Sequence, residues 1–332
     1  MNKQPYRNEE AFSYLSNLIN SPEAGRSAHW AWMLANYAYK EGEFQGLDGF
    51  GGHQPRSVLG SAAHYIMQTP YRLMAKTYPR FTEIHRIGRS IAACQNRLFD
   101  LDMLRQVLTM AFIDDLIDLE GLPGIPLVIG DGFGALTALL LSLLPGRQIM
   151  LINLTPVLLV DLTYIRKVFP LVEIALVESQ AQMEAALDQS KETVIALRAD
   201  FQNFIRHAPI SLAVNVSSMH EMQPSIVERY FSNLRSAKGE HTYFYCCNRI
   251  RKELPDGTVT EFMKYPWHVK DDIIVDELCP WHQKYYIFPP RYLKYDGPIQ
   301  HRLARLLKTQ RDNTCENGSC KSLESRNKRE CF

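Results

Sequence analysis

A glycine-rich loop near the middle of the chain is its first candidate for chemistry. The apolar run 126–129 predicts a buried strand, and the apolar stretch 135–144 predicts a helix that begins at once. A strand that turns directly into a helix leaves free backbone N–H groups, and glycine lets a ligand approach them closely. The segment therefore indicates a loop that binds a nucleotide-type cofactor. The loop consists of Gly130, Asp131, Gly132, Phe133 and Gly134.

A polar residue near the end of the next predicted strand supports the same interpretation. The loop fits the G-x-G-x-x-A form of a dinucleotide fingerprint, in which a polar side chain on the second strand binds the ribose hydroxyls. The second strand is expected over 148–154, which places Asn153 near its end. An amide both accepts and donates hydrogen bonds, so Asn153 is predicted to contact the cofactor. The alternative is a residue that only forms a strand-end turn.

Polar residues also follow a later apolar strand, predicted over 212–216. Ligands of open parallel sheets bind beyond the carboxyl ends of the strands, so this cluster is expected on the same rim as the glycine loop. A histidine next to a glutamate supplies a base for a hydroxyl substrate. The alternative is a helix cap beside a surface histidine. The cluster comprises Ser217, Ser218, His220 and Glu221.

The strand predicted over 241–247 ends in Asn248 and Arg249, which can bind a sugar hydroxyl or a phosphate. The aromatic segment after it contains Trp267 and His268, which can stack on a pyranose face. We therefore predict these four residues to bind the substrate. An ordinary strand-end arginine and core aromatic residues are the alternatives.

The order of predicted elements indicates an α/β fold. Strands and helices alternate from 127 to 247, which predicts a Rossmann-like, mostly parallel sheet with helices on both faces. A mostly helical N-terminal region is expected over 1–120, and the Rossmann-like domain with its aromatic-rich end over 121–300. The polar segment 309–332 has no periodicity and is expected to be a disordered tail.

Composition narrows the classes of function. The 332 residues are 46% hydrophobic with a net charge of +1, which gives no reason to expect binding to nucleic acid. No apolar run approaches the roughly 20 residues that span a bilayer, and the first residues lack a secretion signal, so a cytoplasmic protein is expected. The seven cysteines are expected to be reduced thiols.

No metal is predicted in the site. Cys315 and Cys320 lack the spacing of a zinc knuckle. A hard-ion site at Asp271, Asp272 and Asp276 is the alternative to a solvated acidic loop.

The motifs, taken in chain order, resemble those of a bacterial family of sugar O-methyltransferases, within the class I S-adenosylmethionine-dependent methyltransferases. The resemblance covers roughly residues 60 to 300. It implies S-adenosylmethionine at the glycine loop, Asn153, Ser217 and Ser218, and methyl transfer to a sugar hydroxyl with His220 or Glu221 as base. It rests on the glycine loop, Ile152-Asn-Leu-Thr-Pro156, Asn215-Val-Ser-Ser-Met-His-Glu-Met222, Tyr243-Phe-Tyr-Cys-Cys-Asn-Arg249 and Tyr265-Pro-Trp267.

Two departures from that pattern keep other functions open. The family usually carries an acid two residues before the first glycine and another at the end of the second strand, where this chain has Val128 and Asn153. One alternative is an NAD(P)-dependent oxidoreductase, since the same glycines suit a dinucleotide. The other is a non-catalytic interaction protein of the same fold, with a homo-oligomer formed through the N-terminal helices.

Overall fold

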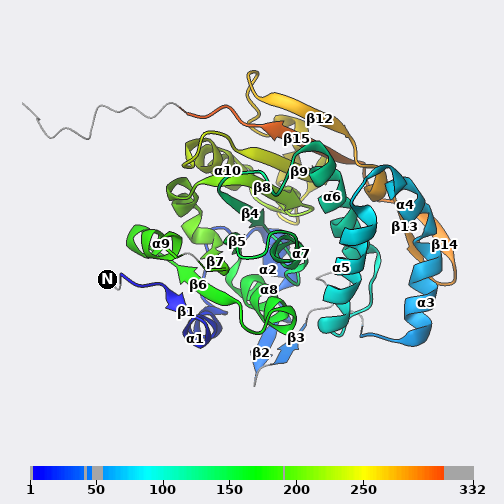
Figure 1. Ribbon diagram of the computed structural model, residues 1–332, viewed down its shortest axis with the longest axis horizontal. Helices are drawn as coiled ribbons and strands as arrows, with labels where there is room; N and C mark the ends of the chain where they lie inside the picture. Colours follow the sequence, from blue (N-terminus) through cyan, green and yellow to red (C-terminus); the bar gives the residue numbers. More distant parts are fainter. Residues whose placement is uncertain (1–2, 41–42, 47–54, 190, 310–332) are drawn as a thin grey trace, which may run out of the picture.

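A nine-stranded sheet forms the centre of the molecule (Figure 1). The computed structural model describes residues 3–40, 43–46, 55–189 and 191–309, so the predicted tail lies almost wholly outside the described residues. The strands of the sheet are β1 (Tyr6–Arg7), β4 (Ile125–Ile129), β5 (Ile149–Asn153), β6 (Glu173–Val177), β7 (Thr193–Arg198), β8 (Ile210–Val216), β9 (Tyr243–Arg249), β12 (Asp272–Leu278) and β15 (Ile299–Arg305). Their order is β1-β6-β7-β5-β4-β8-β9-β15-β12.

The six central strands from β6 to β9 run parallel to one another, which confirms the predicted fold class. Strands β4, β5, β7 and β8 are buried along their whole length, as expected for a sheet covered on both faces. Their near-continuous apolar sequences made these strands recognisable.

Two further strands of the sheet follow the predicted strand 241–247, and the sequence pattern did not indicate them. Strand β15 returns antiparallel to β9, and β12 pairs antiparallel with β15 at the edge of the sheet. Five of the seven β15 residues are buried, yet its sequence Ile-Gln-His-Arg-Leu-Ala-Arg is mostly polar, while β12 is largely exposed. Neither strand shows the apolar run that identified the parallel strands.

Helices cover both faces, as predicted. One face packs against α1, α5, α6, α7 and α8, and the other packs against α9, the 3-10 segment Ala199–His207 and α10. The helices are α1 (Glu9–Leu18), α2 (Ala28–Met33), α3 (Val58–Met67), α4 (Thr69–Met74), α5 (Phe81–Cys94), α6 (Leu101–Leu116), α7 (Ala135–Leu143), α8 (Thr155–Val168), α9 (Gln180–Leu187) and α10 (Pro224–Ser236).

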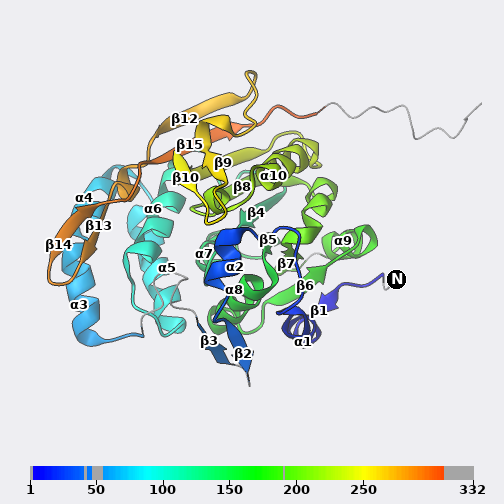
Figure 2. The same ribbon diagram turned by 180° about the vertical axis from the view of Figure 1, so that it is seen from behind.

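The N-terminal region is mostly helical, but it also contributes to the sheet. Strand β1 pairs antiparallel with β6, and helices α5 and α6 share one hydrophobic cluster with α7 and α8. A short hairpin formed by β2 (Ala38–Lys40) and β3 (Glu43–Gln45) follows α2, and 47–54 lies outside the described residues. Figure 2 shows α2 on the side of the molecule that faces the viewer, in front of α7 and α8.

Two hairpins complete the C-terminal part. The hairpin of β10 (Arg251–Glu253) and β11 (Val259–Glu261) follows β9. The hairpin of β13 (Lys284–Ile287) and β14 (Arg291–Lys294) lies beside α3 and α4 (Figure 1). Tyr292 anchors it by donating a 2.7 Å hydrogen bond to the carbonyl of Met67. Within the described part of the chain, every helix is too short or too polar to cross a membrane.

Candidate functional site

A cavity of about 310 Å³ opens at the carboxyl ends of the parallel strands. Strand β4 has β5 on one side and β8 on the other, so the strand order reverses at this point. Open α/β sheets bind ligands at such a switch point. The cavity is lined by the glycine loop, by the ends of β5 and β8, and by residues of α2 and α6. The fold therefore places the predicted rim residues around a ligand-sized space.

The three glycines of the loop have different roles, although all have positive φ angles. A Cβ atom at Gly130 would lie 2.7 Å from Cβ of Ser218, and one at Gly134 would lie 2.5 Å from Cγ1 of Ile165. A Cβ at Gly132 would meet nothing within 4 Å, and Gly132 lines the cavity. Two glycines thus permit close packing, and the third leaves backbone open to a ligand.

Asp131 occupies the N-terminus of helix α7. Its carboxylate accepts hydrogen bonds from the backbone N–H groups of Leu136 (2.9 Å) and Thr137 (2.8 Å). Burial raises the pKa of Asp131 to about 6, although these hydrogen bonds act in the opposite direction. A carboxylate that caps the helix takes the place where a dinucleotide pyrophosphate would bind. The charge at this loop therefore favours a cationic ligand over an anionic one.

Asp161 on helix α8 is a second buried acid at the loop, and the sequence analysis did not single it out. Its carboxylate accepts hydrogen bonds from Gly134 N (3.1 Å) and from Nδ2 of Asn153 (2.8 Å). Burial raises its pKa well above the usual range, and the charge of Asp131 adds to this effect. The available signal was an acid within the otherwise apolar run 156–162.

Asn153 lines the cavity at the end of β5. Both polar atoms of its amide already make a hydrogen bond. Nδ2 donates to Asp161, and Oδ1 accepts from the backbone N–H of Leu154 at 3.0 Å. A ligand hydroxyl can therefore use only the remaining N–H and the second lone pair of the oxygen.

Two asparagines link the ends of β8 and β9 behind the cavity. Asn248 donates to Oδ1 of Asn215 at 2.8 Å, and Asn215 donates to the carbonyl of Ile129 at 2.8 Å. Ser218 also donates to Ile129, at 3.2 Å. This network fixes the ends of three neighbouring strands relative to one another.

Ser217 is the polar residue of this rim that remains available for a ligand. Its backbone has a φ of 57°, and its N–H donates to the carbonyl of Cys247. The hydroxyl is buried without a hydrogen-bond partner among the described residues, and Ser217 lines the cavity. Since buried hydroxyls are normally satisfied, a bound ligand is the natural partner.

Glu221 lies at the cavity wall within a group of basic side chains. Its Oε1 is 2.7 Å from Nζ of Lys252, 3.2 Å from Nε2 of His29 and 3.6 Å from Nε2 of His220. Although burial by itself raises the pKa of Glu221, the hydrogen bonds from both histidines and the charge of Lys252 hold it well below its usual range. Glu221 is thus an ionised carboxylate.

The two histidines differ in their access to the cavity. His29 lines it, whereas His220 is 4% exposed and is absent from the cavity wall. The Nδ1 atom of His220 lies 3.0 Å from Oδ1 of Asn248, and burial lowers its pKa despite the nearby Glu221. The sequence analysis missed His29 because it lies 192 positions before Glu221 and no motif surrounds it.

The four predicted substrate-binding residues do not line the cavity. Asn248 belongs to the buried asparagine network, and Arg249 pairs with Asp296 at 3.3 Å. The Trp267 ring packs against Phe244, on the face of the sheet that α10 covers. His268 lies in the turn beyond it, where its Nδ1 accepts a hydrogen bond from Lys270 N. The structure therefore provides no direct contact between this cavity and these residues. The wall is formed instead by Trp30, Met33, Arg105 and Tyr295, among others.

The acids considered for a hard-ion site each pair with an arginine, so their charge is already balanced. The ion pairs are Asp271–Arg235 at 2.6 Å, Asp272–Arg305 at 3.0 Å and Asp276–Arg302 at 2.5 Å. The two cysteines considered for a zinc knuckle, Cys315 and Cys320, lie outside the described residues.

In comparisons with known proteins, this chain shows a distant similarity to solved structures and no match to a protein family. No protein-family model and no curated protein matches the sequence. The pyocyanin biosynthetic protein PhzM is 10% identical with a TM-score of 0.35, and the match covers 61% of this chain and 57% of PhzM, so the chain spans little more than half of that protein.

Two further solved structures match over most of their length. The Burkholderia thailandensis 1,6-didemethyltoxoflavin-N1-methyltransferase, solved with S-adenosylhomocysteine, is 10% identical over 82% of this chain and 99% of that chain, with a TM-score of 0.35. The mitomycin 7-O-methyltransferase MmcR is 14% identical over 89% of this chain and 93% of that chain, with a TM-score of 0.34.

Proposed function

We propose that this protein is a cytoplasmic S-adenosylmethionine-dependent O-methyltransferase that acts on a hydroxyl of a sugar or sugar-containing acceptor. The observation that carries the proposal is the pairing of the open backbone at Gly132 with the carboxylate of Asp131 at the start of α7. A sulfonium and an ammonium group are cationic and suit this loop, whereas a pyrophosphate would meet a negative charge.

The residues around the loop define the cofactor side of the site. The backbone at Gly132 allows close approach, Asn153 lies at the end of β5, and Ser217 lines the cavity with a buried hydroxyl that has no hydrogen-bond partner among the described residues. When bound, the cofactor supplies an electrophilic methyl group. The loop and these side chains then fix the direction from which an acceptor oxygen approaches.

Glu221 and His29 supply the base. A hydroxyl that attacks a methyl group must lose its proton, and His29 lines the cavity with its Nε2 atom 3.2 Å from Glu221. The ionised Glu221 stabilises the imidazolium that forms when His29 accepts the proton. His220 contacts Glu221 from the buried side and helps to hold the carboxylate in place.

The sugar acceptor follows from the sequence resemblance. The Trp30 and Tyr295 side chains on the cavity wall are compatible with it, because aromatic residues suit the apolar faces of pyranose rings. The homo-oligomer expected through the N-terminal helices stays a prediction.

Thermal unfolding with different ligands tests the cofactor. S-adenosylmethionine and S-adenosylhomocysteine at ~100 times their dissociation constants should stabilise the protein by about 2.7 kcal/mol, a shift of several degrees in the midpoint. NADH and NADPH should give no shift. A shift with the nicotinamides alone would favour the oxidoreductase, and no shift with any ligand would favour the non-catalytic interaction protein.

Cofactor affinity should fall at acidic pH because Asp131 becomes neutral. Its pKa is raised to about 6, so the carboxylate is ionised above that pH and protonated below it. A cationic ligand binds the ionised form better, so affinity should be constant above pH 7 and weaken by up to ~10-fold per pH unit well below pH 6. Isothermal titration from pH 5 to 8 measures this. An Asp131→Asn variant should bind more weakly at pH 8 and lose this pH dependence, whereas an unchanged profile would remove Asp131 from the cofactor site.

A further inference from the structure

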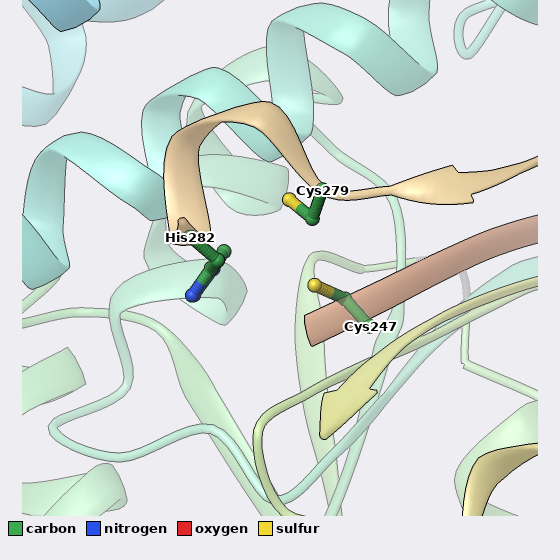
Figure 3. A group of neighbouring side chains, drawn as sticks. All are labelled: Cys247, Cys279 and His282. Atoms are coloured by element: carbon green, nitrogen blue, oxygen red, sulfur yellow. The ribbon is translucent and has the colours of Figure 1, made fainter. Parts of the chain in front are cut away.

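Two cysteines and a histidine, Cys247, Cys279 and His282, form a buried cluster (Figure 3), and His282 lines the cavity. Cys247 is near the end of β9, Cys279 follows β12, and His282 ends the short 3-10 turn Pro280–His282. Figure 3 shows the two sulfur atoms between the strand and this turn, with the imidazole beside them. One possible ligand atom from each residue lies within 4.8 Å of the others. Segments that are distant in sequence thus bring three metal-ligand side chains together.

The donor set matches the chemistry of zinc. Two thiolates and one imidazole form the three-residue set that Zn²⁺ accepts at sites with an exchangeable fourth ligand. Zinc–sulfur bonds of about 2.3 Å and zinc–nitrogen bonds of about 2.0 Å would place the three donor atoms nearly 4 Å apart. Small side-chain movements bring the observed cluster to that spacing.

The local backbone at Cys279 is compatible with a metal ligand. The spacing Cys279-x-x-His282 places two donors on one tight turn. Burial and the neighbouring Cys247 raise the pKa of the Cys279 thiol, while the backbone N–H groups of Trp281 and His282 act in the opposite direction. Such N–H groups stabilise a sulfur that carries negative charge.

His282 provides an independent indication of a missing partner. Its side chain is buried with 3% exposure, and both ring nitrogens lack a hydrogen-bond partner among the described residues. An unsatisfied buried polar group is costly, so native proteins seldom retain one without a reason. Either ring nitrogen is therefore available to bind a metal ion.

We propose that Cys247, Cys279 and His282 bind one zinc ion whose fourth position faces the cavity. His282 lines the cavity and the two cysteines do not, so the open position lies on the histidine side. Binding releases the two thiol protons to solvent, and the two thiolates neutralise the charge of the ion. The site does not depend on the identity of the cofactor, and it departs from the sequence-based expectation that no metal is present.

Metal content and cobalt spectroscopy test the proposal on the full-length protein. The protein is produced with added zinc, kept reduced with a phosphine and desalted, and its metal is measured by mass spectrometry. The apo protein is then titrated with Co²⁺, because a tetrahedral thiolate site gives sulfur-to-cobalt charge-transfer and intense visible bands. We expect one zinc per chain, and cobalt bands that zinc abolishes.

Matched variants assign the ligands. Cys279→Ser and His282→Gln should lose zinc and the cobalt bands, while circular dichroism checks that they remain folded. Cys246→Ser is the control, since Cys246 is equally buried on the same strand but belongs to the opposite hydrophobic cluster. Replacing Cys315, Cys320 and Cys331 together by serine controls for the cysteines outside the described residues. Both controls should retain the metal.

Several results would overturn the proposal. A reduced wild-type protein that binds neither zinc nor cobalt would do so, as would cobalt bands without the sulfur charge-transfer component. Full metal content in folded Cys279→Ser and His282→Gln variants would exclude the site as well, and so would loss of the metal in the triple-serine control alone. Because the readout is metal binding, failure here leaves the proposed methyl transfer untouched, and failure of the cofactor test leaves the zinc site untouched.

Discussion

Gly132→Val is expected to abolish binding of S-adenosylmethionine while the chain remains folded. A Cβ at this position meets no protein atom within 4 Å and enters the space beside the cavity. The branched side chain would then occupy the volume through which the cofactor approaches the backbone. A loss of at least ~100-fold in affinity, or about 2.7 kcal/mol, is expected from isothermal titration.

Backbone strain must be separated from the loss of the cofactor space. Gly132 has a φ of +82°, where a side chain costs roughly 1–2 kcal/mol of stability. Gly146, in the turn between α7 and β5, offers a matched control, because its φ is +79° and its Cβ would also meet nothing within 4 Å. Gly146→Val should lose similar stability yet bind the cofactor normally. Equal affinity in the two variants would refute the assignment of the loop.

The fold was largely predictable because its central strands are apolar throughout. A parallel sheet covered on both faces requires such runs, and β4, β5, β7 and β8 provide them. The antiparallel strands could not be recognised in this way. Strand β12 is exposed along most of its length, and the polar residues of β15 are buried by partners that only the tertiary structure supplies.

The residues of the site that come directly after a strand were predictable. Those that a distant segment of the chain contributes were not. The glycine loop, Asn153, Ser217 and Glu221 come directly after strands or near their ends, and the switch point brings them to one cavity. His29 lies on α2, a six-residue helix whose sequence contains no recognisable motif, so its place in the site could not be predicted.

The predicted substrate-binding residues do not line the cavity for a related reason. Asn248 lies near the end of β9, but its amide is used to link β8 and β9, and Trp267 packs against Phe244 on the face that α10 covers. Residue type and position after a strand suggest a role, but they do not show which way a side chain turns.

Glu221→Gln is expected to cause the largest loss of turnover among the side chains of this site. The carboxylate holds His29, His220 and Lys252 together, and its pKa is held well below the usual range. An amide of the same shape cannot stabilise an imidazolium at His29. We expect kcat to fall by about 10²–10⁴-fold, with little change in cofactor affinity. Single-turnover measurements with a methylated-product assay give the rate, and titration calorimetry gives the affinity.

The two histidines distinguish a base from a positioning residue. His29→Ala should reduce kcat nearly as much as Glu221→Gln, because His29 is the histidine that reaches the cavity. His220→Ala removes a buried contact 3.6 Å from the carboxylate, so its effect on kcat should be smaller and accompanied by a loss of thermal stability. The reverse pattern would make His220 the base and would require the cavity wall to open for the acceptor, since His220 is buried and does not line the cavity.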